Sequence, residues 1–530
     1  MFYLKSPLFH CPLVELQLSK RNFDLTWLCT APSITTYRVN HLQTTTECYK
    51  DYVENLLKGR YKSSPKIYTL SDLPEVLCIG SVSTPETLKP SMVEQREIIV
   101  DDCCGAAVLR GAHIYAVGVL AMESGTKLHD IVNVYADLTG KCKKGTNIRF
   151  ESDKKLYLGQ GRVLMQRYQL FGASGAKTGI AVEMLNTVSG VPSIGDLSSA
   201  KALLQNLPSI VCVRVLNPQK NEIILDMCAA PGNKTTHIAE LMQDKGLILA
   251  LDKTVNRIAL IEEKIKKYNL NSINVYAYDA TKSFNGKLNS ESSNEIKPPF
   301  KAETFDRVLL DAPCSGLGNR PILVVKTTAK MLDSYPKIQR KLVSNAVALL
   351  KPGGCLVYST CSINTSENEE IVAWALAKHS NLELKEAVPI FGSRALPCQG
   401  LTEIQRDMLQ RFSPDTKKFD TMVKRIQMKI LFIYVNIYAA ILRALNSSSC
   451  ISVIMNVPSC NSKTTRRVPP TKRINFNCIT KVMSFSLYLP GEGNSACTTS
   501  AGILASWPSE PSPVCIHSWL VTPAFDTLPL

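Results

Sequence analysis

Two cysteine thiols stand at positions where this sequence could support covalent chemistry. Cys314 lies in LLDAPCSG (309–316), and Cys361 lies in CLVYSTCS (355–362). Each thiol follows an apolar run that predicts a buried strand. The carboxyl ends of parallel strands share one edge of a sheet, where ligands bind, so we expect the two thiols to meet there. Either thiol alone would be interpreted as a buried, inert cysteine, whereas the pair indicates covalent chemistry.

Carboxylates occupy the ends of three predicted strands in the same region. Asp252 ends LILALD, Asp279 ends INVYAYD, and Asp311 ends RVLLD. An acidic residue at such a position accepts hydrogen bonds from ribose hydroxyls or from an adenine amine. Three of them in register therefore predict a cofactor that contains a nucleoside.

A loop of small residues, in DMCAAPGNKTTH (226–237), follows the first strand of this region. Small residues let the backbone approach a ligand closely, and the helix that follows offers its N-terminal amides. The segment matches neither the GxxxxGK[ST] pattern of a P-loop nor the GxGxxG pattern of dinucleotide-binding proteins. It therefore predicts a ligand-binding turn of another kind.

Alternating strands and helices from about residue 200 onward predict an α/β fold with a doubly wound parallel sheet. Upstream, short β-type runs between glycines and charges predict a small barrel. One of these runs is AAVL (106–109). We expect four regions: an N-terminal region at 1–96, the barrel at 97–172, the doubly wound domain at 173–420 and an irregular tail at 421–530.

The composition favours an intracellular protein that binds a polyanion. The net charge is +16 and the isoelectric point is about 9.0, which favours nucleic acid as a partner. The 18 cysteines include no CxxC pair, so we expect neither a structural metal site nor a redox motif. The sequence opens with no signal peptide, and its long apolar run, 430–442, is shorter than the roughly 20 residues that a membrane span needs.

Together these motifs resemble the Sun-domain (NSUN) family of RNA cytosine-C5 methyltransferases. The segments that carry the resemblance are LNPQ (216–219), LDMCAAPGNKTTH (225–237), LDK (251–253), DAPCSG (311–316), QRKL (339–342) and YSTCS followed by ENEE (358–370). Upstream segments resemble the family member that has a PUA barrel inserted before its catalytic domain and that methylates cytosine 72 of tRNA. These segments are RVN (38–40), VLRGAHIYAVGV (108–119) and GKCKKG (140–145).

The resemblance implies roles for the site residues. Cys361 would add to C6 of cytosine, Cys314 would assist removal of the C5 proton and release of the product, and Asp311 would hold the N3/N4 edge of the base. S-adenosylmethionine would contact Asp252 through its ribose, Asp279 near its adenine, Asp311, and the loop residues Cys228, Ala229, Ala230, Pro231, Gly232, Asn233 and Lys234.

By the same resemblance, the PUA barrel would hold the unpaired CCA end and the acceptor stem of tRNA. The corresponding residues are Arg110, Tyr115, Lys143 and Lys144, with Tyr115 as the candidate for stacking on a base. We expect a cytoplasmic monomer with no membrane association, and mRNA stays open as a second class of RNA substrate.

Two departures from the family pattern keep an alternative open. Asn233 replaces a glycine of the cofactor loop, and since Asn tolerates positive φ we expect weaker cofactor binding rather than none. The final apolar strand of the family is missing, although KILFIYVNI (429–437) is a candidate to fill its place, and the tail after 420 is expected to be disordered. The alternative is a catalytically impaired RNA-binding protein of the PUA type. An amino-group methyltransferase is disfavoured, because DAPC stands where such enzymes carry an Asn/Asp-Pro-Pro-Tyr/Phe segment.

Overall fold

The computed structural model describes residues 6–19, 25–61, 63–82, 95–172, 178–194, 197, 199–286 and 296–412, and the strands at 433–437, 483–485 and 501–503. The chain divides into two compact units, Met1–Leu445 and Asn446–Leu530. In the second unit, β20 (Met483–Phe485) and β21 (Ala501–Ile503) form an antiparallel pair. Apart from these two strands and the strand at 433–437, the tail predicted to be disordered lies outside the described residues. Within the described ranges, no helix combines the length and the apolar character that crossing a membrane requires.

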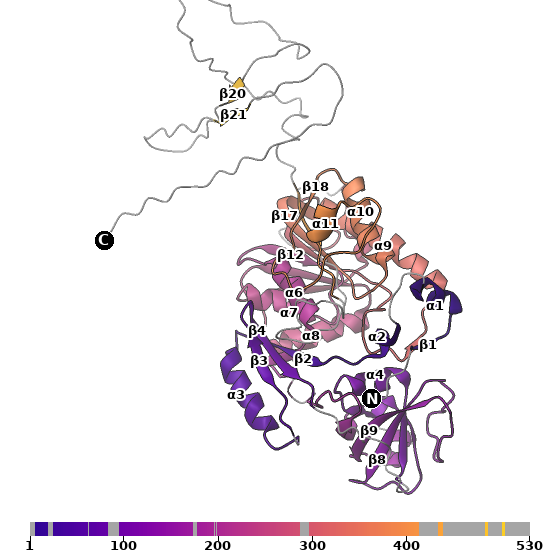
Figure 1. Ribbon diagram of the computed structural model, residues 1–530. Coiled ribbons are helices and arrows are strands. Elements are labelled where there is room, and N and C mark those ends of the chain that lie inside the picture. The colour runs from indigo at the N-terminus through magenta and orange to yellow at the C-terminus, as the bar shows by residue number, and fades with distance from the viewer. Residues whose placement is uncertain are drawn as a thin grey trace, which may run out of the picture. The chain divides into compact units, whose positions relative to one another are not determined.

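The largest sheet of the first unit has seven strands, in the order β14-β13-β12-β15-β17-β19-β18, and its strands β12 and β17 are labelled in the upper part of that unit in Figure 1. Counted along the chain, this order is 3-2-1-4-5-7-6, and the first five strands run parallel to one another. The predicted doubly wound fold is therefore confirmed. The strands are β12 (Ile223–Asp226), β13 (Leu247–Asp252), β14 (Ile273–Ala277), β15 (Phe305–Asp311), β17 (Leu350–Ser359), β18 (Leu382–Lys385) and β19 (Ile433–Ile437).

Strand β19 lies between β17 and β18, in the place of the final apolar strand of the family. It runs antiparallel to β17 on one side, with Val357 opposite Tyr434, and antiparallel to β18 on the other, with Leu384 opposite Val435. The edge of β17 is thereby paired rather than open. The expectation that the final strand is missing is wrong, and the candidate segment KILFIYVNI is confirmed at residues 433–437, which form that strand.

Alternate residues along the central strands face opposite layers of helices, as the period of two in a strand requires. Ile224 and Leu309 pack with α6, α7 and α8, whereas their neighbours Leu225 and Leu310 pack with α9 and α10. Both faces of the sheet are therefore apolar and covered, which is typical of parallel sheets. The helices are α6 (Leu207–Leu216), α7 (Asn233–Leu241), α8 (Val255–Tyr268), α9 (Ala329–Leu349) and α10 (Glu369–Lys378).

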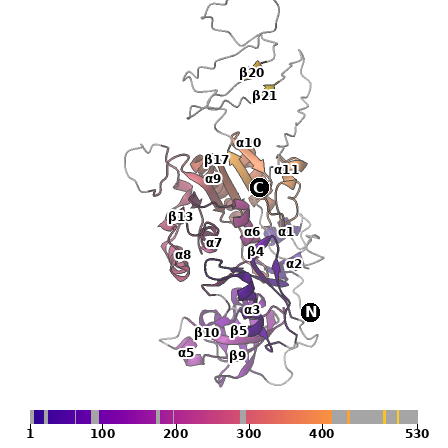
Figure 2. The same cartoon turned by 90° about the vertical axis from the view of Figure 1, so that its left-hand side faces the viewer.

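A four-stranded antiparallel sheet, in the order β11-β2-β4-β3, belongs mainly to the N-terminal region. Its buried residues pack with α3 (Thr46–Leu57), in the indigo part of the chain in Figure 2. Its fourth strand, β11, comes from residues that follow the predicted barrel, so the barrel region is an insertion within this sheet. The strands are β2 (Ile34–Val39), β3 (Ile67–Leu70), β4 (Leu73–Gly80) and β11 (Ala202–Leu204).

The inserted region forms a six-stranded mixed sheet, in the order β6-β10-β9-β8-β5-β7. Strand β10 pairs with β9, so the sheet extends beyond the predicted boundary at residue 172. The strands are β5 (Glu97–Val100), β6 (Ile114–Tyr115), β7 (Val119–Met122), β8 (Ile131–Asp137), β9 (Lys155–Val163) and β10 (Ile180–Thr187).

The predicted β-type run AAVL (106–109) belongs instead to helix α4 (Asp102–Leu109). The side chain of Asp101 caps this helix by accepting a hydrogen bond from the Cys104 amide at 2.6 Å. At Gly105 the helix lies so close to Ala136 that an added Cβ would come within 2.6 Å of it. An N-cap and a close helix–sheet contact, neither visible in hydrophobic periodicity, account for the difference.

The first described residues pack against the loop that follows Cys314. Strand β1 (Leu8–Phe9) pairs in parallel with β16 (Val324–Val325), and α1 (Pro12–Ser19) and α2 (Leu25–Cys29) share an apolar cluster with Leu317. The guanidinium of Arg320 lies 3.9 Å from the ring centre of Trp27 and donates to the Trp27 carbonyl at 2.9 Å. The N-terminal segment therefore fixes the loop between Cys314 and α9.

Candidate active site

Cys314 and Cys361 meet at the carboxyl-end edge of the sheet, beyond β15 and β17. Their Sγ atoms are 3.3 Å apart, and the backbone amide of Cys361 lies 3.4 Å from Cys314 Sγ. With the Cys314 S–H as the donor, this contact lowers the pKa of Cys361 and raises that of Cys314 well above its usual value. The geometry thus makes Cys361 the more readily ionised thiol, and only the thiolate is nucleophilic.

The buried side chain of Glu367 connects the two cysteine segments. Its carboxylate accepts from the Ser315 amide at 2.8 Å, from the Ser315 hydroxyl at 2.7 Å and from the Ser362 hydroxyl at 2.7 Å. Because Ser315 follows Cys314 and Ser362 follows Cys361, one carboxylate fixes the spacing of both thiols. Gln339 donates to the Pro313 carbonyl at 3.0 Å and so adds support from α9.

Asp311 and Lys234 form an ion pair next to the thiols. Lys234 Nζ lies 2.7 Å from Asp311 Oδ2, and the Ser359 hydroxyl donates to Asp311 Oδ1 at 2.7 Å. Burial acts to lower the pKa of Lys234, but the adjacent Asp311 carboxylate outweighs it and raises that pKa. Lys234 is therefore a cation at neutral pH, and it orients Asp311 toward the reacting edge.

A cavity of about 600 Å³ opens where the parallel strands end, and we call it the strand-end cavity. The predicted cofactor residues that line it are Cys228, Ala230, Asp252, Asp279 and Asp311. The predicted residues Ala229, Pro231 and Gly232 belong to the same loop but do not line this cavity, and Asn233 and Lys234 line a second one. The cavity lies beside β12 and β15, where the strand order reverses and doubly wound folds bind their ligands.

The acidic residues of the strand-end cavity suit a nucleoside. Asp252 is buried and accepts from the Ala230 amide through Oδ2 at 3.2 Å, whereas its Oδ1 has no hydrogen-bond partner among the described residues. A buried carboxylate oxygen without a partner is costly, and a ribose hydroxyl would satisfy it. Asp279 is held by Thr281, whose hydrogen bonds lower the pKa of Asp279. The carboxylate acceptors of this cavity therefore fit the ribose and adenine of S-adenosylmethionine.

The cofactor loop contradicts the premise on which the expectation about Asn233 rests, and weaker cofactor binding stays a prediction. The positive φ of this loop, +91°, belongs to Gly232, where an added Cβ would also lie 3.2 Å from Ile261. Asn233 is the first residue of α7 and has no positive φ. The premise that position 233 needs the conformational freedom of glycine is therefore wrong. Its carbonyl instead accepts a hydrogen bond from Arg38 at 2.5 Å.

A second cavity of about 560 Å³ adjoins the thiols, and we call it the three-part cavity. Its walls come from the four-stranded sheet, from the segment between α4 and β6, and from the catalytic sheet edge. Residues of these three walls include Thr36, Tyr37, Arg110, Tyr115, Lys234 and Asn233. Asp311, Asn319 and Cys361 line both cavities, so the two cavities meet at Cys361.

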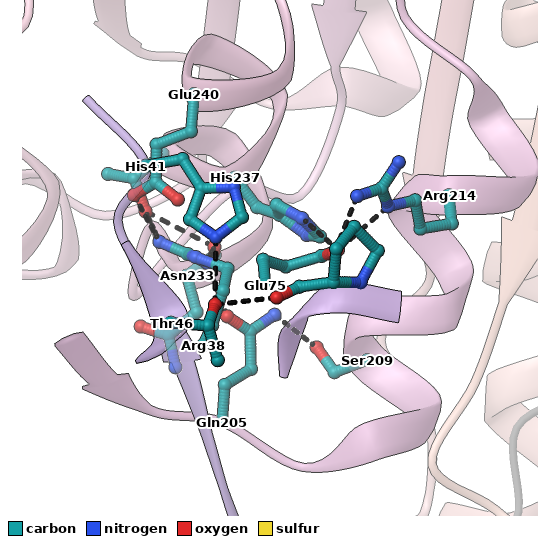
Figure 3. A network of polar contacts seen from close by, with 12 residues as sticks. Arg38, His41, Thr46, Glu75, Gln205, Ser209, Arg214, Asn233, His237 and Glu240 are labelled. Carbon is teal, nitrogen blue, oxygen red and sulfur yellow. Dashed lines mark hydrogen bonds and ion pairs between the residues drawn. The ribbon is translucent and has the colours of Figure 1, made fainter. Parts of the chain in front are cut away.

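A buried polar network joins the four-stranded sheet to the cofactor loop (Figure 3). Arg38 of β2 pairs with Glu240 of α7 at 2.9 Å, donates to Thr236 at 2.9 Å and also donates to Gln205. Arg38 and Glu240 are both buried, with side chains 1% and 5% exposed. Since Arg38 also holds the Asn233 carbonyl, the N-terminal sheet orients the residue that precedes Lys234.

Glu75 of β4 forms a second set of polar contacts between the four-stranded sheet and helices α7 and α6. It pairs with Arg214 at 2.5 Å and with the ring of His237 at 3.2 Å (Figure 3). Burial lowers the pKa of His237 to about 4, so the ring is neutral at physiological pH. Burial acts to raise the pKa of Glu75, but the hydrogen bonds from His237 and Arg214 hold it well below its usual range. Glu75 therefore stays ionised at physiological pH, and it attaches the four-stranded sheet to helices α6 and α7.

The structure separates the four predicted RNA-binding residues into two groups. Arg110 and Tyr115 line the three-part cavity, and the Tyr115 side chain is half exposed. Lys143 and Lys144 are exposed on a turn of the six-stranded sheet and line neither cavity. Only the first pair therefore shares a cavity with Cys361.

Two residues of the site were missed at the sequence level. Glu367 belongs to the ENEE segment, so the family pattern contained a signal for it, but not its bridging position. Asn319, which follows DAPCSG by three residues, carries no motif of its own. The contact of Asn319 with Cys361 depends on the conformation of a loop, which hydrophobic periodicity does not predict.

Comparisons with known proteins agree with this geometry. The family model 16S rRNA methyltransferase RsmB/F matches residues 213–424. The tRNA (cytosine(72)-C(5))-methyltransferase NSUN6 of Mus musculus is 42% identical over 77% of this chain and 84% of its own length. Its Homo sapiens counterpart is 42% identical over 78% and 88%, respectively. The crystal structure of NSun6 from Pyrococcus horikoshii with SFG, an analogue of S-adenosylmethionine, superposes with a TM-score of 0.61 at 27% identity, covering 82% of this chain and all of that one.

Proposed function

The chain belongs to the NSUN (RsmB/F) family of RNA cytosine-C5 methyltransferases, and we propose that it methylates cytosine 72 at the acceptor end of tRNA. The observation that carries this proposal is the pair of thiols, 3.3 Å apart, at the junction of the two cavities. The strand-end cavity would hold S-adenosylmethionine, which supplies an electrophilic methyl group. The three-part cavity would hold the cytosine after it has left its stack.

The residues of the site supply the remaining chemistry. Cytosine C5 is a poor nucleophile until a thiolate adds to C6, and Cys361 is the thiol whose pKa is lowered. Once Cys361 is bonded to carbon it is no longer an anion, so Cys314 loses the contact that raises its own pKa. Cys314 can then lose its proton to solvent. After methyl transfer the resulting Cys314 thiolate accepts the C5 proton, the electrons of that C–H bond re-form the C5–C6 double bond, and the C6–S bond breaks to return Cys361 as a thiolate. Asp311, oriented by Lys234, faces the base as an acceptor for its amine.

The six-stranded sheet is, in this proposal, the inserted PUA domain that holds the CCA end. Its insertion between β4 and β11 and the presence of Arg110 and Tyr115 in the three-part cavity support the assignment. Lys143 and Lys144 would contact phosphates of the acceptor stem from outside the cavity. A monomer that acts in the cytoplasm, with mRNA as a further substrate class, belongs to the same proposal.

The alternative, a catalytically impaired RNA-binding protein, has lost the two observations that favoured it. Strand β19 lies between β17 and β18 and supplies the final strand of the family, and Gly232 rather than Asn233 provides the positive φ of the cofactor loop. Both thiols and a complete strand-end cavity are present. Methyl transfer is therefore the function that the site supports best.

A methyl-transfer assay tests the proposal. Acceptor-end RNA with cytosine at position 72 should be methylated, and the same RNA with adenosine there should not. Replacement Cys361→Ala should lower the rate by at least about 1,000-fold, because the covalent step is removed. Equal rates for the wild type and this variant would refute the nucleophile, and equal rates on both RNAs would refute the target base.

A further inference from the structure

Asn319 contacts the nucleophilic sulfur and has no role in the mechanism described above. Its side-chain Nδ2 lies 3.2 Å from Cys361 Sγ, with the amide N–H as donor and the sulfur as acceptor. The residue is exposed and lines both cavities. It therefore stands at the point where cofactor, base and thiol would converge.

The backbone around Asn319 is fixed relative to Cys361. The Gly318 amide donates to the Cys361 carbonyl at 2.8 Å, and the Asn319 amide donates to the Gly316 carbonyl at 3.0 Å. Gly316 adopts a φ of +69°, which favours glycine at this turn. On the other side, Arg320 is buried against Trp27 of the N-terminal segment. The amide of Asn319 is thus presented to the sulfur by a loop held at both ends.

We propose that Asn319 is a catalytic residue that donates a hydrogen bond to Cys361 Sγ and stabilises its thiolate. The proposal rests on the function proposed for Cys361. A donor stabilises a charged acceptor more than a neutral one, so the contact favours the thiolate over the thiol.

The charged and titratable groups near Cys361 act in both directions. The hydrogen bond from Cys314 makes the largest contribution and lowers the pKa of Cys361, whereas burial and the Asp311 carboxylate raise it. The hydrogen bond from Asn319 and the charge of Lys234 lower it further. Asn319 therefore works against the neighbouring carboxylate, which is needed for the base but disfavours the thiolate.

The test measures ionisation of the thiol without any methyl transfer. The full-length protein is alkylated with iodoacetamide across a range of pH, and the peptide that contains Cys361 is quantified by mass spectrometry. Replacement Asn319→Ala should move the midpoint for Cys361 upward by about one pH unit, a tenfold loss of thiolate at a fixed pH below the midpoint. Asn319→Asp, which keeps the shape but replaces the donor by an anion, should move it further.

Asn206 provides the matched control, because it is an exposed asparagine that lines the same three-part cavity and has no contact with the sulfur among those described. Asn206→Ala should leave the Cys361 profile unchanged, and exposed Cys48 should react alike in all variants. An unchanged Cys361 midpoint in both Asn319 variants overturns the proposal, as does an equal shift in Asn206→Ala.

The outcome is separable from that of the proposed function. If the Asn319 variants shift the midpoint while Cys361→Ala still methylates RNA, the nucleophile assignment fails and the contact with the thiol stands. If Cys361→Ala is inactive and the midpoint does not move, the role of Asn319 alone is refuted.

Discussion

The two cavities that meet at Cys361 are of similar volume but are built in different ways. The strand-end cavity, of about 600 Å³, is lined by residues of the catalytic domain, which follow one another at the ends of successive strands. The three-part cavity, of about 560 Å³, takes its walls from segments separated by up to 329 positions in the chain, from Pro32 to Cys361. The strand-end cavity is formed within the catalytic domain alone, whereas the three-part cavity forms only where segments from three parts of the first unit pack together.

In the proposed function, this difference separates the cavity that holds the cofactor from the cavity that selects the substrate. A doubly wound sheet forms a crevice at its carboxyl edge by topology alone, so the cofactor side needs only the correct strand order. The substrate side depends on the ion pairs of Arg38 and Glu75, which attach the N-terminal sheet to α7 and α6. Changes on the two sides should therefore have separable effects.

Loss of Arg38 should produce the largest effect. Replacement Arg38→Ala leaves Glu240 buried without its cation, and we expect a loss of about 3–5 kcal/mol in the free energy of unfolding. Urea denaturation measures it, and the double replacement Arg38→Met with Glu240→Leu, which removes both charges, is the control and should recover most of the loss. A loss below about 1 kcal/mol for Arg38→Ala would mean that the attachment of the N-terminal sheet does not depend on this pair.

Asp252 tests the strand-end cavity by itself. Replacement Asp252→Ala removes the carboxylate oxygen that lacks a partner, and affinity for S-adenosylmethionine should fall by about 10- to 100-fold, corresponding to about 1.5–3 kcal/mol. Isothermal titration calorimetry measures it, and Asp252→Asn, which keeps one oxygen, should lose less. RNA affinity should not change. Equal losses of cofactor and RNA affinity would contradict the separation of the two sides.

Tyr115 tests the three-part cavity with a smaller expected effect. Stacking of a base on an aromatic ring contributes about 1–3 kcal/mol. Because Tyr115 is half exposed, we expect the lower part of this range, about 1–2 kcal/mol, so Tyr115→Ala should weaken RNA binding by about 5- to 30-fold and leave cofactor affinity unchanged. Tyr168, which is 70% exposed and lines neither cavity, is the matched control. If Tyr168→Ala weakens RNA binding as much as Tyr115→Ala, the cavity is not the stacking site.

The same contrast explains what the sequence could predict. Cys314, Cys361, Asp252 and Asp311 each follow an apolar run, and parallel topology brings such ends together without further information. The final strand, β19, was harder to predict, because it runs antiparallel to β17 and its sequence differs from the family's motif for this strand. In the N-terminal half, AAVL lies in a helix owing to the Asp101 cap.

The contacts of Asn319 and Arg38 could not be predicted from sequence motifs, for a related reason. Asn319 depends on a loop fixed by residues near the N-terminus, and the contact of Arg38 with Asn233 spans 195 positions in the chain. Hydrophobic periodicity reports local elements and says little about contacts between distant ones.

The central claim is that Cys361 adds to the base and Cys314 assists its release. Trapping the covalent intermediate tests this claim most directly. With tRNA and S-adenosylmethionine, Cys314→Ala should accumulate a protein–RNA adduct that survives denaturation and maps to the peptide containing Cys361, because addition proceeds while release is blocked. The double replacement Cys314→Ala with Cys361→Ala should give no adduct. An adduct in the double variant, or wild-type turnover by Cys314→Ala without any adduct, would contradict the account.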